Sequence, residues 1–322
     1  MKSNIYPIVL MLTSTMMAAS ASNWIAIWVG MEINLLAFIP LIKNKSMETS
    51  SSMMNYFLAQ SLGSMILLFT VLINSLIMLP PNMINEMINI AMITSILIKL
   101  GCPPFHFWLP KTMNSMNWDS CMWLMTWQKL APMTAMFQLT EKSSITTTVA
   151  LLATTWGSLG GINQTSLRMM MGYSSMTHMG WMITLSTISS NWLMYLIIYS
   201  STVLVLCFQF KKMNALYINQ LTTVNKPNKT IMLINMMSMG GLPPFLGFLP
   251  KWMTIQSCIQ SNEIMQILIM SLLSLMTLFF YLKMVMAPML SSSIIQKQMK
   301  NRSSFTMMFI VNLTLPLMII LI

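Results

Sequence analysis

Three ionisable side chains lie deep inside apolar stretches of this sequence. Glu32, Lys99 and Lys129 each belong to a mostly apolar run long enough to cross a bilayer, which takes roughly 20 residues. A charge in hydrocarbon is costly, so such groups must be neutral, paired or hydrated, and they often mark an ion or proton path. A buried arginine would stay charged, whereas a buried lysine can release its proton. The lysines therefore favour proton transport.

Glu32 and Lys99 form a candidate ion pair between two helices. If they meet, each offsets the cost of burying the other, and moving one proton changes the energy of the pair strongly in a low dielectric. Such a pair can act as a switch that releases a proton toward Lys129. The alternative for Glu32 is a lone packing carboxyl bonded to a neighbouring serine or asparagine.

The stretch that follows Lys99 occurs twice. The sequence GCPPFHFWLPK at 101–111 returns as GLPPFLGFLPK at 241–251, an offset of 140 residues. The paired prolines remove two backbone donors and should break a helix. Broken helices at corresponding places in two halves of a membrane protein indicate a transport site, because the freed backbone groups cannot face lipid. The alternative is that the prolines only shape the packing of two kinked helices.

Two histidines lie in or beside these polar stretches. His106 directly follows the first break, where its ring could relay a proton or could bond carbonyl groups freed by the break. His178 lies in the run MGYSSMTHMGW at 171–181, whose hydroxyl groups could hold a water wire or could satisfy one another. Both are candidate relays, and the structural alternative stays open for each.

The composition excludes a soluble globular domain: 56% of the 322 residues are hydrophobic, 7% are charged, and the mean hydropathy is +0.69. We predict an all-α polytopic membrane protein of about eleven transmembrane helices, two of them broken. Pro132 should kink its helix soon after Lys129. Gln60 and its uncharged span should serve packing, and Gly157 should allow two helices to approach closely. The expected spans are 5–21, 24–42, 54–79, 83–109, 118–139, 145–162, 168–189, 191–210, 228–258, 263–289 and 304–322.

The net charge of +11 does not indicate nucleic-acid binding, because of where the basic residues fall. If the loops are assigned alternately to the two sides of the membrane, one side receives nearly all the loop lysines and arginines. The other side receives only Lys142. This asymmetry is the positive-inside signal, which places the N-terminus and the basic loops on the cytoplasmic or equivalent side. The C-terminus should lie on the opposite side.

The sequence contains no recognisable cofactor site. The four cysteines are scattered through apolar spans without a close pair, so we predict no disulfide framework, zinc site or iron–sulfur site. A glycine-rich dinucleotide fingerprint is missing as well. Any redox chemistry that drives this protein should therefore belong to other chains.

Four runs of residues, in order, resemble one known family. They are MEINLLAFIP at 31–40, KLGCPPFHFWLP at 99–110, TWQKLAP at 126–132 and GLPPFLGFLPKW at 241–252. Together they are similar to the antiporter-like subunits in the membrane arm of mitochondrial NADH:ubiquinone oxidoreductase, respiratory complex I. The number of spans resembles the shortened animal form, and the residue usage looks insect-like.

This resemblance implies a single transmembrane antiporter-like domain built from two inverted five-helix repeats, each with one broken helix. The halves would be 1–139 and 145–289, followed by a last helix at 304–322. The implied proton path runs through Glu32 with Lys99, then Lys129, then Lys251. Lys111 takes the place of Lys251 in the first copy of the repeat, but the family pattern gives it no path role, and it lies at a loop edge where it can reach water.

The resemblance further implies redox-driven proton translocation across the inner mitochondrial membrane, with the N-terminus on the matrix side and the C-terminus on the intermembrane-space side. The chain would be a non-redox subunit of the enzyme and would bind no cofactor. NADH, FMN, iron–sulfur clusters and ubiquinone would bind to partner subunits. Its own contacts would be other membrane-arm subunits, including neighbouring antiporter-like subunits, and membrane lipids.

Two other functions stay open at this point. A free-standing cation/proton antiporter subunit would share the broken helices but would work without NADH. A structural membrane subunit would hold its lysines paired and static, and would tolerate uncharged replacements once assembled.

Overall fold

The computed structural model describes residues 5–43, 47–76, 82–139, 144–223 and 226–290. Every element in these ranges is a helix, and β pairing there is limited to an isolated bridge between Ser166 and Tyr217. The all-α prediction is therefore confirmed. The last predicted span, 304–322, lies outside the described residues.

Five of the described helices are long and apolar enough to cross a membrane. Two shorter apolar helices, Ile5–Ser20 and Thr230–Gly240, accompany them. The predicted spans with internal breaks divide into shorter helices, and the count of eleven stays a prediction. The five long segments are Trp24–Ile42, Met47–Ser75, Ile145–Ile162, Trp192–Met213 and Ile264–Met286.

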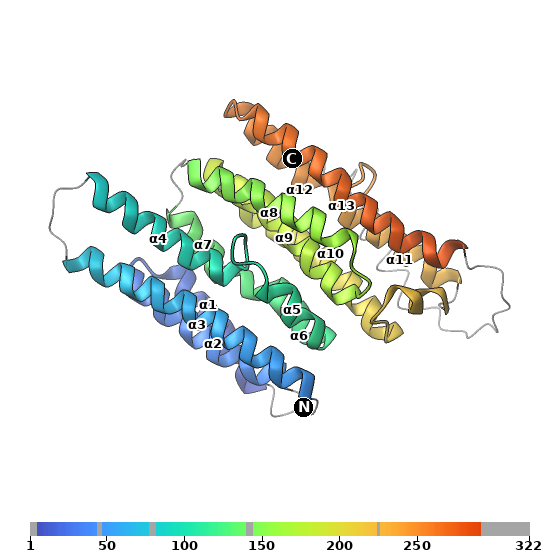
Figure 1. The fold of residues 1–322 in the computed structure, drawn as a ribbon, viewed down its shortest axis with the longest axis horizontal. Helices are drawn as coiled ribbons and strands as arrows, with labels where there is room; N and C mark the ends of the chain where they lie inside the picture. The colour runs from blue at the N-terminus through green and yellow to red at the C-terminus, as the bar shows by residue number, and fades with distance from the viewer. Residues whose placement is uncertain (1–4, 44–46, 77–81, 140–143, 224–225, 291–322) are drawn as a thin grey trace. The chain divides into compact units, whose positions relative to one another are not determined.

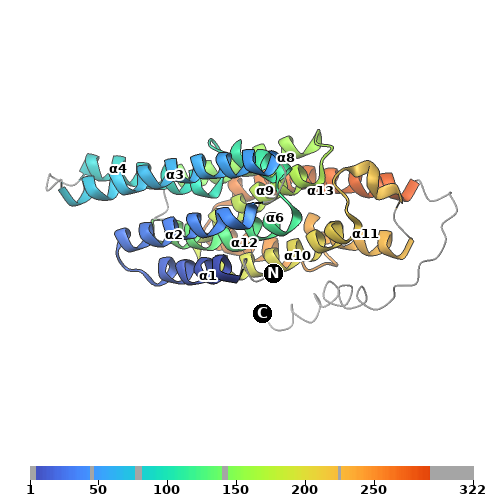
Figure 2. The ribbon, with the colours of Figure 1, turned by 90° about the horizontal axis from the view of Figure 1, so that it is seen from below.

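The chain forms two compact units, residues 1–149 and 150–322. In the first unit, α1 packs against α2, and α3 packs against both α2 and α4 (Figure 1). Figure 2 shows α1 beside α2 and α3 beside α4. The helix α7 contacts α1, α2 and α4, so it lies inside this unit. The elements are α1 (Ile5–Ser20), α2 (Trp24–Ile42), α3 (Met47–Leu76), α4 (Asn82–Leu100), α5 (Trp108–Ser115), α6 (Trp118–Met125), the 3₁₀ turn η2 (Trp127–Lys129), α7 (Leu130–Leu139) and the start of α8 (Ser144–Ile162).

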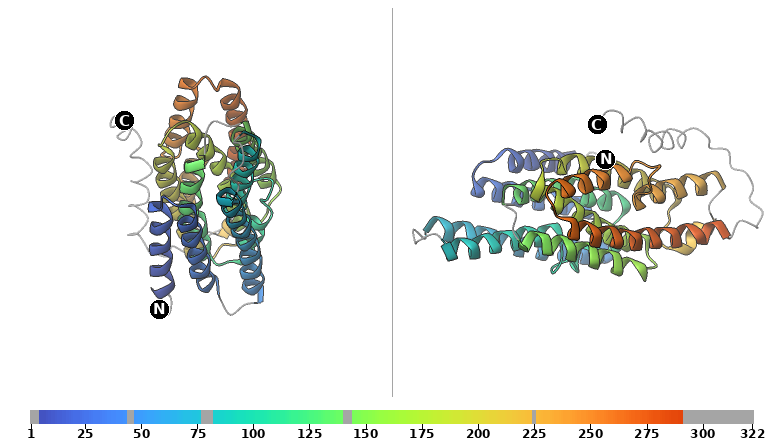
Figure 3. Two further views of the ribbon diagram at one scale, coloured as in Figure 1. Left: turned by 90° about the vertical axis from the view of Figure 1, so that its left-hand side faces the viewer. Right: turned by 90° about the horizontal axis from the view of Figure 1, so that it is seen from above.

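In the second unit α9 is the central helix. It is buried along most of its length and contacts α10, α12 and α13. A Cβ at Gly157 of α8 would lie 2.6 Å from Thr177 Cγ2 on α9, which confirms the predicted close helix packing. Figure 3 shows the hairpin of α12 and α13 in orange. The elements after α8 are α9 (Leu167–Ile188), α10 (Trp192–Met213), η3 (Ile218–Thr223), α11 (Lys226–Gly240), α12 (Phe248–Gln260) and α13 (Ile264–Leu290).

The segment that carries Lys129 is less regular than predicted. The chain leaves the α-helical path at Thr126, where φ is −109° and ψ is −74°, and passes through η2 before α7 begins. Pro132 explains this, because it lacks the N–H that would bond the Gln128 carbonyl and its ring crowds that carbonyl. The predicted kink was expected after Lys129, whereas the irregular segment contains Lys129 itself.

Candidate functional site

The first helix break lies between α4 and α5. Gly101 has a φ of +69°, a left-handed conformation that other residues rarely adopt. The amide N–H groups of Gly101 and Cys102 donate to the carbonyls of Ile98 and Leu97 at 3.2 and 3.0 Å. This pair of bonds is the Schellman pattern, which ends a helix while satisfying its last carbonyls.

Uncharged side chains complete the capping of this break. The Trp108 indole N–H donates to the Ile98 carbonyl at 3.0 Å, and the Gln60 amide donates to the Lys99 carbonyl at 3.0 Å. Gln60 thus joins α3 to the end of α4, which agrees with the predicted packing role and adds a cap that the sequence did not predict. Neither side-chain cap uses a lysine.

The Lys99 side chain is buried in the last turn of α4, with 5% of its surface exposed. Gly63 on α3 makes room for it, since a Cβ there would lie 3.0 Å from Lys99 Cγ. Glu32 on α2 is close enough to interact electrostatically with Lys99 and with Tyr56. Its Oε1 atom is buried without a hydrogen-bond partner. Glu32 and Lys99 therefore lie within electrostatic range of each other, but the structure records no direct ion pair between these two described residues, so the predicted pair stays a prediction.

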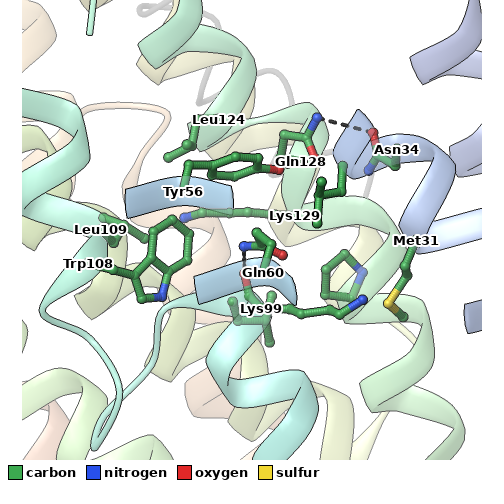
Figure 4. Close-up of a pocket in the computed structure, with 13 residues that line it drawn as sticks. Met31, Asn34, Tyr56, Gln60, Lys99, Trp108, Leu109, Leu124, Gln128 and Lys129 are labelled. Carbon is green, nitrogen blue, oxygen red and sulfur yellow. Dashed lines mark hydrogen bonds between the residues drawn. The ribbon is translucent and has the colours of Figure 1, made fainter. Parts of the chain in front are cut away.

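Lys99 and Lys129 line the same cavity in the first unit. Lys129, at the end of η2, has only 3% of its surface exposed. The cavity has a volume of about 20 Å³, which suffices for a water molecule. In Figure 4 the Lys99 side chain extends toward Met31 and that of Lys129 extends toward Trp108. The two amines thus point to different sides of one small polar space.

The second break, between α11 and α12, repeats the backbone pattern of the first. Gly241 has a φ of +77°, and its N–H donates to the Ser238 carbonyl at 3.0 Å. Its side-chain cap is different, because Lys251 Nζ donates to the Gly240 carbonyl at 2.7 Å. Lys251 is buried, with 6% of its surface exposed. The fourth predicted carrier is therefore also a structural cap.

His178 and Lys251 lie in the lining of one closely packed polar region of the second unit, which leaves no room for a water molecule. Its Nδ1 lies 2.9 Å from the Tyr195 hydroxyl. The hydroxyls of Ser174, Ser175 and Thr177 donate to carbonyls of their own helix at 2.7–2.9 Å. The single donor of each hydroxyl is therefore used by its own helix backbone, and the relay role of His178 stays a prediction.

His106 is buried inside the first break, and it does not line the cavity of Lys99 and Lys129. Its ring stacks on Phe107 at 4.2 Å and bonds to the backbone at Pro104. That contact corresponds to the capping alternative. Within the part of the chain that the structure describes, no three His, Cys, Asp or Glu side chains gather to hold a metal ion.

Residues 21–277 match the family described as "NADH:quinone oxidoreductase/Mrp antiporter, TM". The chain belongs to this family. Among curated members, NADH-ubiquinone oxidoreductase chain 2 of Locusta migratoria is 38% identical, over 85% of this chain and 81% of the relative. NADH-ubiquinone oxidoreductase chain 2 of Anopheles gambiae is 37% identical, over 86% of this chain and 83% of the relative.

Solved structures of the NADH:quinone oxidoreductase/Mrp antiporter type share the fold. A chain of respiratory complex I from Thermus thermophilus is 17% identical, with a TM-score of 0.80 over 95% of this chain and 74% of that chain. A chain of the Mrp complex from Dietzia is 16% identical, with a TM-score of 0.74 over 86% of this chain and 59% of that chain.

Sequence reasoning missed the neutral side chains around the two lysines. Asn34, Tyr56 and Gln128 line the cavity with them and are joined by hydrogen bonds. Asn34 and Gln128 lie within two of the runs that carry the family resemblance, next to charged residues already singled out. That position was the available signal for both, whereas Tyr56 had none.

Proposed function

We propose that this chain is a proton-translocating subunit in the membrane arm of NADH:ubiquinone oxidoreductase, and that its buried lysines carry the protons. The observation that carries this proposal is the shared cavity of Lys99 and Lys129. Family membership and the names of the relatives support assembly with other membrane-arm subunits. In this proposal the partner subunits bind NADH, FMN, the iron–sulfur clusters and ubiquinone, and this chain performs no redox step.

The proposed cycle starts with Lys99 protonated next to Glu32. When a rearrangement weakens that electrostatic interaction, an N–H bond of the Lys99 ammonium breaks and its proton passes through the cavity to the Lys129 amine. A lysine suits this step because it can exist as ammonium or as amine when buried, which an arginine cannot. Lys251 is the distal carrier, and His178 beside it is its candidate relay.

The proposed location is the inner mitochondrial membrane, crossed by about eleven helices in two inverted repeats. The asymmetry of the basic loops supports an N-terminus on the matrix side and a C-terminus on the intermembrane-space side.

Membership of the complex is tested first. Mildly solubilised source membranes are run on a native gel with an NADH dehydrogenase stain, and the chain is located by mass spectrometry. We expect it in the stained high-mass band. Migration alone, or with a few small membrane chains, would contradict the proposal and favour the free-standing antiporter.

The proton path is tested with Lys129→Met in the assembled complex, using Lys111→Met as the matched control. Lys111 is exposed and takes no part in the cavity. We expect NADH-driven proton pumping to fall at least about tenfold in Lys129→Met, a change of about 1.4 kcal/mol in the barrier, and to persist in Lys111→Met. Full pumping by an assembled Lys129→Met complex would reject the path and favour a structural subunit.

A further inference from the structure

We propose that Tyr56 and Gln128 are positioning residues for proton transfer between Lys99 and Lys129. Gln128 holds the Tyr56 hydroxyl so that its oxygen faces the cavity as a hydrogen-bond acceptor for the migrating proton. The inference rests on the proposed function, because it concerns the same cavity.

The contacts of the Gln128 amide fix which way it points. Its nitrogen lies 3.2 Å from Met11 Sδ and 3.1 Å from Asn34 Oδ1. A thioether sulfur can only accept a hydrogen bond, so the NH₂ group must be on this side. The amide oxygen therefore faces the opposite way, where the Tyr56 hydroxyl donates to it at 3.4 Å.

This bond determines what Tyr56 presents to the cavity. A phenol has a single O–H donor, and here its partner is the Gln128 amide oxygen at a long 3.4 Å, which leaves the oxygen lone pairs for other groups. The ring itself is held in place: it is 2% exposed and packs edge-on against Phe38 at 5.1 Å and Trp108 at 6.0 Å. Tyr56 is therefore a fixed acceptor in the wall shared with the two lysines (Figure 4).

The surrounding groups also favour a cation in this cavity. The Gln60 NH₂ group donates to the Lys99 carbonyl. Its amide oxygen remains as an acceptor in the lining of the cavity. Glu32 interacts electrostatically with both Tyr56 and Lys99. Preorganised acceptors of this kind stabilise positive charge without having to reorient when it arrives.

The step conserves protons and electrons. One N–H bond of the Lys99 ammonium breaks, the proton crosses by way of a water molecule in the cavity, and a new N–H bond forms on the Lys129 amine. Tyr56 keeps its own proton on the side of Gln128 and accepts a hydrogen bond from the moving charge. No oxidant or reductant takes part.

The test compares Tyr56→Phe, Gln128→Leu and the double variant in the assembled complex. Tyr56→Phe removes one oxygen and keeps the ring, so it should assemble even if Gln128→Leu does not. We expect each single change to slow NADH-driven proton pumping about three- to tenfold and to raise its solvent deuterium isotope effect. The double variant should be no slower than the slower single variant, because both changes act through the same oxygen.

Two buried residues of the second unit that line neither the cavity nor the closely packed polar region serve as matched controls. Tyr281→Phe and Gln209→Leu remove the same chemical groups from buried positions, and both should leave the pumping rate and the isotope effect unchanged. Unchanged pumping in Tyr56→Phe, or slowing that multiplies in the double variant, would overturn the inference.

The Lys129→Met complex separates this inference from the proposed function. If Lys129→Met loses pumping while Tyr56→Phe pumps normally, the positioning role is wrong and the lysine path stands. If Lys129→Met pumps normally, the lysine path fails and the positioning role fails with it.

Discussion

The two helix breaks have the same backbone but different caps. Each ends its first helix with the same pair of amide-to-carbonyl bonds around a glycine of positive φ, at Gly101 and Gly241. In the first break the indole of Trp108 caps a carbonyl. The repeat places Phe248 at the equivalent position of the second break, and its ring has no N–H to donate. Lys251 provides the side-chain cap there instead.

The lysines at the end of each repeat also differ, in how deeply their side chains are buried. Lys111 and Lys251 are equivalent in the repeat, yet Lys111 is exposed whereas Lys251 is buried against its break. In the first break neutral side chains cap the helix end, and Lys99 lines the cavity. In the second break Lys251 caps the helix end, and we propose that the same lysine also carries protons. Because a bond from an ammonium is stronger than one from a neutral amine, proton loss by Lys251 should also loosen its helix break.

The largest effect that separates the two breaks is expected from Gly247→Ala. A Cβ at this position would overlap the Ser238 carbonyl oxygen of α11, and backbone cannot move aside easily. We expect a destabilisation of about 3 kcal/mol or more, seen as loss of assembled complex on a native gel. The equivalent residue in the first break is Phe107, which is 72% exposed, and Phe107→Ala should assemble normally.

A smaller effect is expected from Trp108→Phe, which gives the first break the aromatic residue of the second. The Ile98 carbonyl loses its indole donor but keeps the bond from the Gly101 N–H, so the cost should be about 1 kcal/mol. Thermal unfolding of the purified complex measures this change. Phe248→Leu, which removes no donor, is the control, and equal destabilisation by both variants would contradict the capping role of Trp108.

Gly63→Ala should have a modest effect confined to the first unit. The added methyl would press on the Lys99 side chain at 3.0 Å and on the Ser95 carbonyl at 3.1 Å, at a cost of about 1 kcal/mol. Because Lys99 would shift, proton pumping should fall more than the amount of assembled complex. A parallel loss of both would show that Gly63 matters for packing alone.

The smallest effect is expected from Gly240→Ala in the second break. The nearest atoms to an added Cβ are 3.6 Å away on Leu278, an ordinary packing distance. Stability should change by less than about 0.5 kcal/mol, measured by thermal unfolding. A large loss of stability would contradict this, because it would show that the residue whose carbonyl Lys251 caps must be glycine.

The sequence predicted the features that depend on local chemistry. Proline pairs after glycine break helices wherever they occur, and a lysine in an apolar run is visible without knowing its neighbours. The breaks and the burial of Lys99 and Lys129 were therefore predictable, whereas Lys251 entered the predicted path only through the family resemblance. The all-helical fold followed from the apolar composition.

What the sequence could not supply depends on how separate helices pack. Gln60 lies 39 residues from the carbonyl that it caps, and Gln128 lies 72 residues from Tyr56, so neither contact has a local signal. The Lys251 cap also needs the folded break to bring its amine back to Gly240. The sequence repeat alone does show that Trp108 in the first copy is replaced by Phe248 in the second.

The most direct test of the account is the number of protons pumped per NADH oxidised by assembled Lys251→Met and Trp108→Phe complexes. Both variants remove a cap, but only the first removes a proposed carrier. If Lys251 carries protons, Lys251→Met should lose pumping while Trp108→Phe keeps the normal ratio in the complex that assembles. A normal ratio in Lys251→Met would contradict the account, because Lys251 would then be a cap and nothing more.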